Sequence, residues 1–162
     1  MTTEIPSPLA VEVGNALTAR GRTLAIAESC TGGLIAGAIT DVPGSSVWFE
    51  RGFVTYSNEA KMEMLGVRPD TLAAHGAVSE ATAAEMATGA LTHSRADVAE
   101  AVTGVAGPVG GSPAKPVGTV CLAWARRNGT VDTHTRHFAG DRAAVRGATV
   151  EAALRGLIDR SD

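Results

Sequence analysis

Short apolar runs alternate with segments of helical periodicity along this chain, and this alternation constrains the fold more than any other feature. The run at residues 23–27 is bounded by polar residues, which is typical of a strand buried on both faces. Ahead of it, Leu9, Val13 and Leu17 recur at helical spacing, and Gly21 is placed to end that helix. Further strands are expected at residues 52–57, 98–103, 117–125 and 130–138, and further helices at residues 32–40, 58–65 and 79–91 and after Asp141.

The order of these elements predicts an α/β fold. Strand–helix pairs early in the chain favour parallel strands, whereas Asn128-Gly129 between the last two runs is a strong signal for an antiparallel hairpin. We therefore expect three layers, α/β/α, with helices on both faces of a mixed, mostly parallel sheet. A length of 162 residues, of which 44% are hydrophobic, suits a single domain over residues 1–162.

Charge and composition argue against several classes of protein. The net charge is -3 and no basic stripe occurs, so binding to nucleic acid is not expected. No stretch approaches the ~20 apolar residues that a membrane span needs, and residues 1–6 lack the basic and apolar parts of a signal peptide. Cys30 and Cys121 are too few for a disulfide framework. We expect a cytoplasmic protein with no membrane partner.

Three polar loops are expected where ligands of open α/β sheets bind, beyond the carboxyl ends of the strands. They follow Ala27, Ser57 and Thr103. The first loop brings hydroxyls and then two glycines to the start of a helix, so Ser29 could be a nucleophile and the helix amides an oxyanion hole. The alternative is a polar turn with ordinary capping. Cys30 could itself attack, although a small buried filler is the more usual role of such a cysteine.

The second loop leads into a helix with Lys61 in its first turn if Asn58 is the N-cap. A cation at this end of a helix is disfavoured, which would help the lysine act as a base, but by only ~0.3–1 kcal/mol. Lowering a lysine pKa to near neutrality needs about 4 kcal/mol, so burial would have to supply the rest. The alternative is a solvated surface lysine.

The third loop and the last helix offer candidate ligand contacts. Residues 103–112 could wrap a ligand with backbone amides, although they match neither a P-loop nor a dinucleotide fingerprint; the alternative is a flexible connection. Thr103, at the end of a strand, is the sharper candidate there. Arg142 follows the expected cap Asp141 and suits phosphate capture at a helix start, unless it is a plain surface arginine.

No metal site is expected from the histidines and cysteines. His134 and His137 are an odd number of residues apart in an expected strand, so they point to opposite faces. Neither a His-Glu-x-x-His nor a Cys-x-x-Cys motif occurs, and there is no Gly-x-Ser-x-Gly motif.

Five motifs in order, within a span from about residue 9 to residue 157, resemble those of the CinA C-terminal domain family, the nicotinamide-nucleotide amidohydrolases. The motifs are Ala27-Glu-Ser-Cys-Thr-Gly-Gly33, Pro43-Gly-Ser-Ser-Val-Trp-Phe-Glu-Arg-Gly-Phe-Val-Thr-Tyr-Ser-Asn-Glu-Ala-Lys61, His75-Gly-Ala-Val-Ser79, Thr103-Gly-Val-Ala-Gly-Pro108 and Lys115-Pro-Val-Gly-Thr119. Some family members carry an additional N-terminal domain. This chain is too short to include that domain, so it resembles the stand-alone form. The resemblance implies conversion of nicotinamide mononucleotide to nicotinate mononucleotide and ammonia, in pyridine-nucleotide salvage. It also implies Ser/Lys catalysis without metal or cofactor, and a homodimer.

Carried onto this sequence, the resemblance gives roles to the residues singled out above. Ser29 is the first choice for the nucleophile and Ser46 the second. Lys61 is the base that takes the hydroxyl proton, and Tyr56 relays a proton or orients Lys61. Backbone amides near residues 29–33, or near residues 103–104, stabilise the oxyanion. The expected substrate-binding residues are Cys30, Thr31, Gly32, Gly33, Thr103, Gly104 and Arg142, with Arg142 on the 5′-phosphate and Thr103 on the ribose or phosphate.

Two other functions stay open at this point. A non-catalytic nucleotide-binding or regulatory domain would keep the pocket without turnover. A hydrolase of another amide or of a phosphate ester could use the same loops. The presence of Ser29, Lys61 and Tyr56 together favours catalysis, because a pure binding protein has no need of a base.

Overall fold

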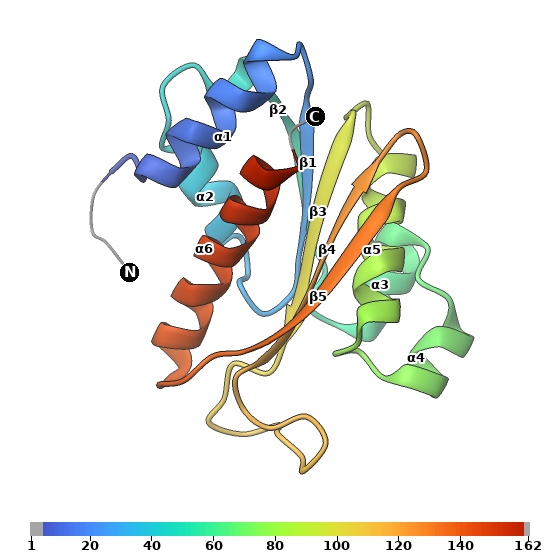
Figure 1. The fold of residues 1–162 in the computed structure, drawn as a ribbon. Helices are drawn as coiled ribbons and strands as arrows, with labels where there is room; N and C mark the ends of the chain where they lie inside the picture. Colours follow the sequence, from blue (N-terminus) through green and yellow to red (C-terminus); the bar gives the residue numbers. More distant parts are fainter. Residues whose placement is uncertain (1–4, 161–162) are drawn as a thin grey trace.

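A five-stranded sheet with helices on both faces makes up residues 5–160, the part of the chain that the computed structural model describes (Figure 1). The strands are β1 (Leu24–Glu28), β2 (Phe49–Val54), β3 (Val98–Gly104), β4 (Thr119–Arg126) and β5 (Val131–His137). The helices are α1 (Pro8–Ala19), α2 (Leu34–Thr40), α3 (Asn58–Leu65), α4 (Pro69–His75), α5 (Glu80–Thr92) and α6 (Arg142–Asp159), with a 3-10 turn η1 (Ser45–Val47). Within this range no helix is both long and apolar enough to cross a membrane. Residues 1–4 of the segment that argued against a signal peptide lie outside the described residues.

The strands lie in the order β2-β1-β3-β4-β5. β1 pairs in parallel with β2 and β3, whereas β4 pairs antiparallel with β3 and β5. Four strands therefore point one way and β4 points the other, which confirms the expected α/β fold with a mixed sheet. Counted by neighbouring pairs the sheet is half antiparallel, because the chain reverses between β3 and β4 and again between β4 and β5. The carboxyl ends of β1, β2 and β3 meet at one edge, as expected.

The two faces of the sheet carry side chains of different size. Helices α1, α2 and α6 cover one face over large residues such as Leu17, Ile26 and Leu154 (Figure 1). Helix α5 lies on the other face, where the buried residues of the strands and of the helix are mostly alanines. Small side chains on both partners let the helix approach the sheet closely and still fill the space between them. Both layers hold the central strands firmly, so the loops at their ends start from fixed positions.

Two expected boundaries were wrong. The second strand is Phe49–Val54, not residues 52–57. Its first half was missed because Glu50 and Arg51 are charged and interrupt the apolar pattern. Charged residues are common on an edge strand such as β2. The N-cap of α3 is Ser57, not Asn58: the Ser57 hydroxyl accepts a hydrogen bond from the Ala60 amide at 3.0 Å. Lys61 is thus the fourth residue of its helix.

Helix α4 was not expected from the sequence. It is seven residues long and begins at Pro69, where a proline fits the first turn. The Glu85 carboxylate, from α5, accepts hydrogen bonds from the Arg68 amide and the Thr71 hydroxyl. A short helix of this kind depends on such tertiary contacts more than on its own periodicity.

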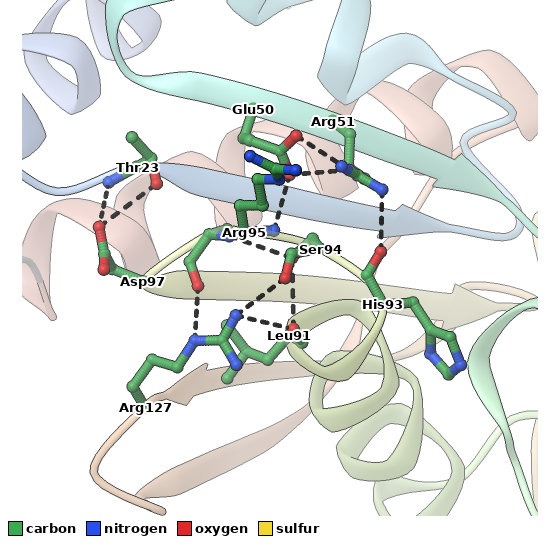
Figure 2. Close-up of polar contacts among 10 residues, drawn as sticks. Thr23, Glu50, Arg51, Leu91, His93, Ser94, Arg95, Asp97 and Arg127 are labelled. Atoms are coloured by element: carbon green, nitrogen blue, oxygen red, sulfur yellow. Dashed lines mark hydrogen bonds and ion pairs between the residues drawn. The ribbon is translucent and has the colours of Figure 1, made fainter.

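A polar network ties down the amino ends of the strands (Figure 2). The guanidinium of Arg127, in the turn between β4 and β5, donates to three backbone oxygens, those of Leu91, Ser94 and Ala96. The Asp97 carboxylate accepts the backbone N–H of Thr23 at 2.8 Å. These bonds hold the beginnings of β1 and β3 and the turn of the β4–β5 hairpin together, at the end of the sheet remote from the polar loops.

Candidate active site

A cavity of about 250 Å³ opens at the carboxyl ends of β1 and β3. Its lining comes from the loops after β1, β2 and β3, from the segment between α4 and α5, and from the start of α6. The residues that line it are Ser29, Cys30, Tyr56, Asn58, Lys61, Ala77, Val78, Thr103, Gly104, Ala106 and Arg142. Seven of the eleven expected site residues are therefore brought to one place from four separate parts of the chain.

Lys61 is a buried lysine at the base of this cavity, with 1% of its surface exposed. Its Nζ lies 3.1 Å from Oγ of Ser29 and 3.1 Å from the backbone oxygen of Thr55. The backbone oxygen of Tyr56 lies 3.5 Å from the same nitrogen. The alternative of a solvated surface lysine is therefore wrong.

Burial lowers the pKa of Lys61 from its ordinary value of 10.5. Removing an ammonium from water without a compensating negative charge favours the neutral amine. No carboxylate lies within 4.0 Å of Nζ among residues 5–160, and the nearby Cys30 opposes the effect only in part. A neutral amine has two N–H groups and one lone pair. Two backbone oxygens can take the N–H groups, which leaves the lone pair for the Ser29 hydroxyl.

Ser29 is the first residue beyond β1 and is nearly buried. Its N–H donates to the backbone oxygen of Val102 in β3 at 3.1 Å, so the two central strands together fix its position. Ser46, the second choice for the nucleophile, lies elsewhere. It is exposed in η1, at the amino end of β2, and does not line the cavity. The structure therefore brings Ser29 to Lys61 and leaves Ser46 at the opposite edge of the sheet.

Glu28 takes up the helix amides that were expected to face a ligand. Its carboxylate accepts hydrogen bonds from the N–H groups of Gly33, Ile35 and Ala36 and from the hydroxyl of Thr31. A carboxylate at a helix start satisfies orphan amides and complements the helix dipole. The amide of Gly32 instead donates to the backbone oxygen of Ser29.

Thr31, Gly32 and Gly33 are absent from the residues that line the cavity, and they shape the turn behind Ser29, so the expectation that they bind substrate stays a prediction. Gly32 and Gly33 have φ values of 57° and 107°, which residues with a side chain rarely adopt. The amides of Cys30 and Thr31 donate to no other residue within the described part of the chain. They are the ones left over in this turn.

Arg146, one turn into α6, holds the same turn from its other side. Its guanidinium donates to the backbone oxygens of Cys30 at 3.1 Å and Thr31 at 3.2 Å. No role was expected for Arg146, because the two backbone oxygens that it contacts lie 116 and 115 positions away along the chain. The contacts make Arg146 a support for the serine turn.

Cys30 lies next to Ser29 and is 5% exposed. Burial is the main cause that raises the pKa of its thiol to about 11. The thiolate is the reactive form of cysteine, so at neutral pH this group is overwhelmingly the unreactive thiol. Cys30 is better suited to filling the wall of the cavity than to attacking a substrate.

Tyr56 and Arg142 meet at the mouth of the cavity. The Arg142 guanidinium donates to the Tyr56 hydroxyl at 3.1 Å and to the backbone oxygen of Gly107 at 2.7 Å. The Tyr56 side chain is 63% exposed, and only its backbone oxygen faces Lys61. Of the two roles expected for Tyr56, orientation of Lys61 is therefore possible through the backbone, while the hydroxyl is directed to Arg142.

Thr103 and Gly104 close the floor of the cavity at the end of β3. The Thr103 hydroxyl donates to the backbone oxygen of Ala77 at 2.8 Å, which joins β3 to the wall formed by Ala77 and Val78. This wall was missed from the sequence, although it lies within the His75-Gly-Ala-Val-Ser79 motif. Apolar residues flanked by Gly76 carried no chemical signal there. Asn58 was also missed as a cavity residue, because it was expected to cap its helix.

Within residues 5–160, no group of three or more His, Cys, Asp or Glu side chains is arranged to hold a metal ion. Cys30 and Cys121 are free thiols.

Comparisons with known proteins agree on one family. The model of the CinA C-terminal domain matches residues 6–160. The nicotinamide-nucleotide amidohydrolase PncC of Escherichia coli strain K12 is 58% identical over 149 residues, which cover 92% of this chain and 90% of that protein. A CinA-like protein of Chlorobaculum tepidum is 53% identical over 91% of this chain, but this region makes up only 36% of that protein.

Solved structures show the same fold. A competence/damage inducible protein from Agrobacterium tumefaciens, 49% identical, superposes with a TM-score of 0.92 over 99% of this chain and 100% of that chain. A CinA superfamily protein from Klebsiella pneumoniae, 45% identical, superposes with a TM-score of 0.91 over 94% of this chain and 95% of that chain.

Proposed function

The chain belongs to the CinA C-terminal domain family, and from this membership and the chemistry of the cavity we propose that it is an amidohydrolase of nicotinamide mononucleotide. The products are nicotinate mononucleotide and ammonia. The name of its Escherichia coli relative supports the substrate, and the buried contact between Lys61 and Ser29 is the single observation that supports the chemistry.

The proposed reaction starts with the neutral amine of Lys61, which takes the proton of the Ser29 hydroxyl as Oγ attacks the carboxamide carbon. The carbonyl oxygen becomes an oxyanion, and the unoccupied amides of Cys30 and Thr31 are the donors nearest in sequence to the nucleophile. As the C–N bond breaks, the Lys61 ammonium returns the proton to the leaving nitrogen, and ammonia departs. Water then attacks the ester on Ser29, again with Lys61 as base, and releases the carboxylate product and the free serine.

Arg142 binds the 5′-phosphate in this proposal. Arg142 is the only arginine among the cavity-lining residues. It is the first residue of α6 and lies at the mouth of the cavity. A phosphate there gains charge-assisted hydrogen bonds from the fork of the side chain. In the same proposal the ribose contacts Thr103, whose hydroxyl lies on the floor of the cavity and donates to the backbone oxygen of Ala77.

Release of ammonia from nicotinamide mononucleotide tests the proposal. Lys61→Met keeps the volume of the side chain and removes the base, and we expect it to lower kcat by at least ~100-fold. Arg68→Met removes an exposed positive charge on a neighbouring helix and serves as the control, with unchanged turnover.

Either of two results would contradict the proposal. Turnover that survives in Lys61→Met would remove the lysine from the mechanism. A folded wild-type protein that binds the nucleotide without releasing ammonia would instead be the nucleotide-binding domain that the sequence left open.

A further inference from the structure

Asn58 is a polar side chain in the cavity that the proposed reaction does not use. The other strong hydrogen-bonding side chains of the lining each have at least one protein partner: Ser29 and Lys61 bind each other, Tyr56 accepts from Arg142, and Thr103 donates to a backbone oxygen. The Asn58 side chain makes no hydrogen bond within residues 5–160. Its donor and acceptor are therefore available to a ligand.

Capping does not explain this asparagine. An asparagine at a helix start commonly serves as the N-cap, but here Ser57 has that duty, and Asn58 is the first residue of α3. Its side chain is exposed at the cavity and is not needed to satisfy an amide of its own helix.

Asn58 is also close to the catalytic pair along the chain. It precedes Lys61 by three residues on α3, and residues so spaced share a face of a helix. Both side chains contribute to the lining of the same cavity. A substrate group at Ser29 and Lys61 is therefore flanked by the side-chain amide of Asn58.

A primary carboxamide and an asparagine side chain are complementary. Each has one C=O acceptor and an NH₂ donor, so two such groups can pair through two hydrogen bonds. A carboxylate, the group left after hydrolysis, only accepts hydrogen bonds, so it can use the donor of Asn58 but not its acceptor. An asparagine at this position suits recognition of the amide more than of the acid.

We propose that Asn58 recognises the carboxamide of the substrate through its side-chain amide, and so helps to select amide over acid. This inference rests on the proposed function and adds a specificity-determining residue to it. The Asn58 side chain orients the carboxamide with its carbon toward Ser29, and removal of the side chain weakens ligands that carry the carboxamide but not a ligand with a bare pyridine ring.

A comparison of two ligands, each measured with the wild type and with Asn58→Ala, tests whether Asn58 recognises the carboxamide. The first ligand is nicotinamide mononucleotide, read as kcat/KM for ammonia release. The second is the same nucleotide with a plain pyridine ring in place of nicotinamide, read as its inhibition constant against the first. In Asn58→Ala we expect kcat/KM to fall roughly tenfold, the effect of one to two neutral hydrogen bonds, with no change in the inhibition constant of the pyridine nucleotide.

Glu59→Ala is the matched control, because Glu59 lies in the same helical turn, is exposed and does not line the cavity. It should change neither quantity. An unchanged kcat/KM in Asn58→Ala would overturn the proposal, and so would an equal loss for both ligands, which would indicate general damage to the cavity. Absence of ammonia release in the wild type would refute the proposed function instead, so the two failures are distinguishable.

Discussion

The hydroxyl of Tyr56 lies 3.1 Å from the guanidinium of Arg142, whereas only the backbone oxygen of the same tyrosine faces the amine of Lys61. The side chain of Tyr56 thus serves the mouth of the cavity and its backbone serves the base. A tyrosine placed in this way positions Arg142, the proposed phosphate ligand, rather than acting on Lys61, the proposed base, through its side chain.

Tyr56→Phe is accordingly expected to raise KM for nicotinamide mononucleotide about 3- to 10-fold, because Arg142 loses one of its two partners, while kcat stays within about twofold. Steady-state kinetics separate the two constants. Arg142→Ala should raise KM further, since it removes the charge itself. A fall in kcat of two orders of magnitude in Tyr56→Phe would restore the tyrosine as a proton relay.

Ser29, Cys30 and Ser46 can be ranked by three substitutions. We expect Ser29→Ala to lose at least ~100-fold in kcat, because the nucleophile is gone. Cys30→Ala should retain most activity, because its thiol, with a pKa of about 11, supplies almost no thiolate at neutral pH. Ser46→Ala, at the far edge of the sheet, should match the wild type. A reversed order between Ser29→Ala and Cys30→Ala in the ammonia assay would make the cysteine the nucleophile.

The pH dependence of turnover follows from burial of Lys61. Burial lowers the pKa of this amine from 10.5, and only the neutral amine can accept the serine proton. The rate should therefore rise with pH along a limb whose midpoint lies below 10.5. A profile of kcat/KM against pH, recorded where the protein remains folded, gives this midpoint. A limb centred at the ordinary lysine value would mean that burial does not activate the amine.

Much of this site was predictable because its chemistry is local to motifs. Ser29 follows a buried apolar run, and Lys61 lies in the first turn of a helix. Both positions can be inferred from neighbouring residues alone. The α/β class and the succession of helices and strands along the chain followed from the same alternation, whereas the strand order β2-β1-β3-β4-β5 was not predicted. The roles of Glu28 and Arg146 could not be foreseen in this way, because each depends on a backbone group that comes close only in the folded chain.

The same limit explains the errors at the helix starts. Glycines before a helix suggest that its first amides are free to bind a ligand. In the structure the Glu28 side chain, at the end of β1, turns toward these amides and accepts their hydrogen bonds. The choice between Ser57 and Asn58 as the cap is similar, since both residue types favour that position. In the structure Ser57 is the N-cap, and the side chain of Asn58 lines the cavity instead.

Glu100 offers a prediction about stability. It lies in the middle of β3, fully buried, and neither of its carboxyl oxygens has a hydrogen-bond partner among the described residues. Desolvation raises its pKa well above the ordinary 4.5, and the nearby Glu28 adds to the effect. The protonated form is therefore the one that the fold favours.

A raised folded pKa means that the folded chain binds more protons than the unfolded chain. The contribution of Glu100 to stability is thus fully present below about pH 4, the ordinary value, and is lost as the pH rises through the folded pKa. We expect Glu100→Gln to be more stable than the wild type at pH 8 and about equally stable at pH 4. Urea unfolding of both proteins at the two pH values measures this, and an equal difference at both would contradict it.

The contacts at the amino ends of the strands share no residue with the cavity (Figure 2). Arg127 and Asp97 set the register of the sheet from one edge, and the serine turn and the loop at residues 104–118 occupy the other. The molecule therefore separates its scaffold from its recognition surface. Substitutions meant to change the ligand of the cavity can therefore be confined to residues near Arg142, while the contacts of Arg127 and Asp97 stay unchanged.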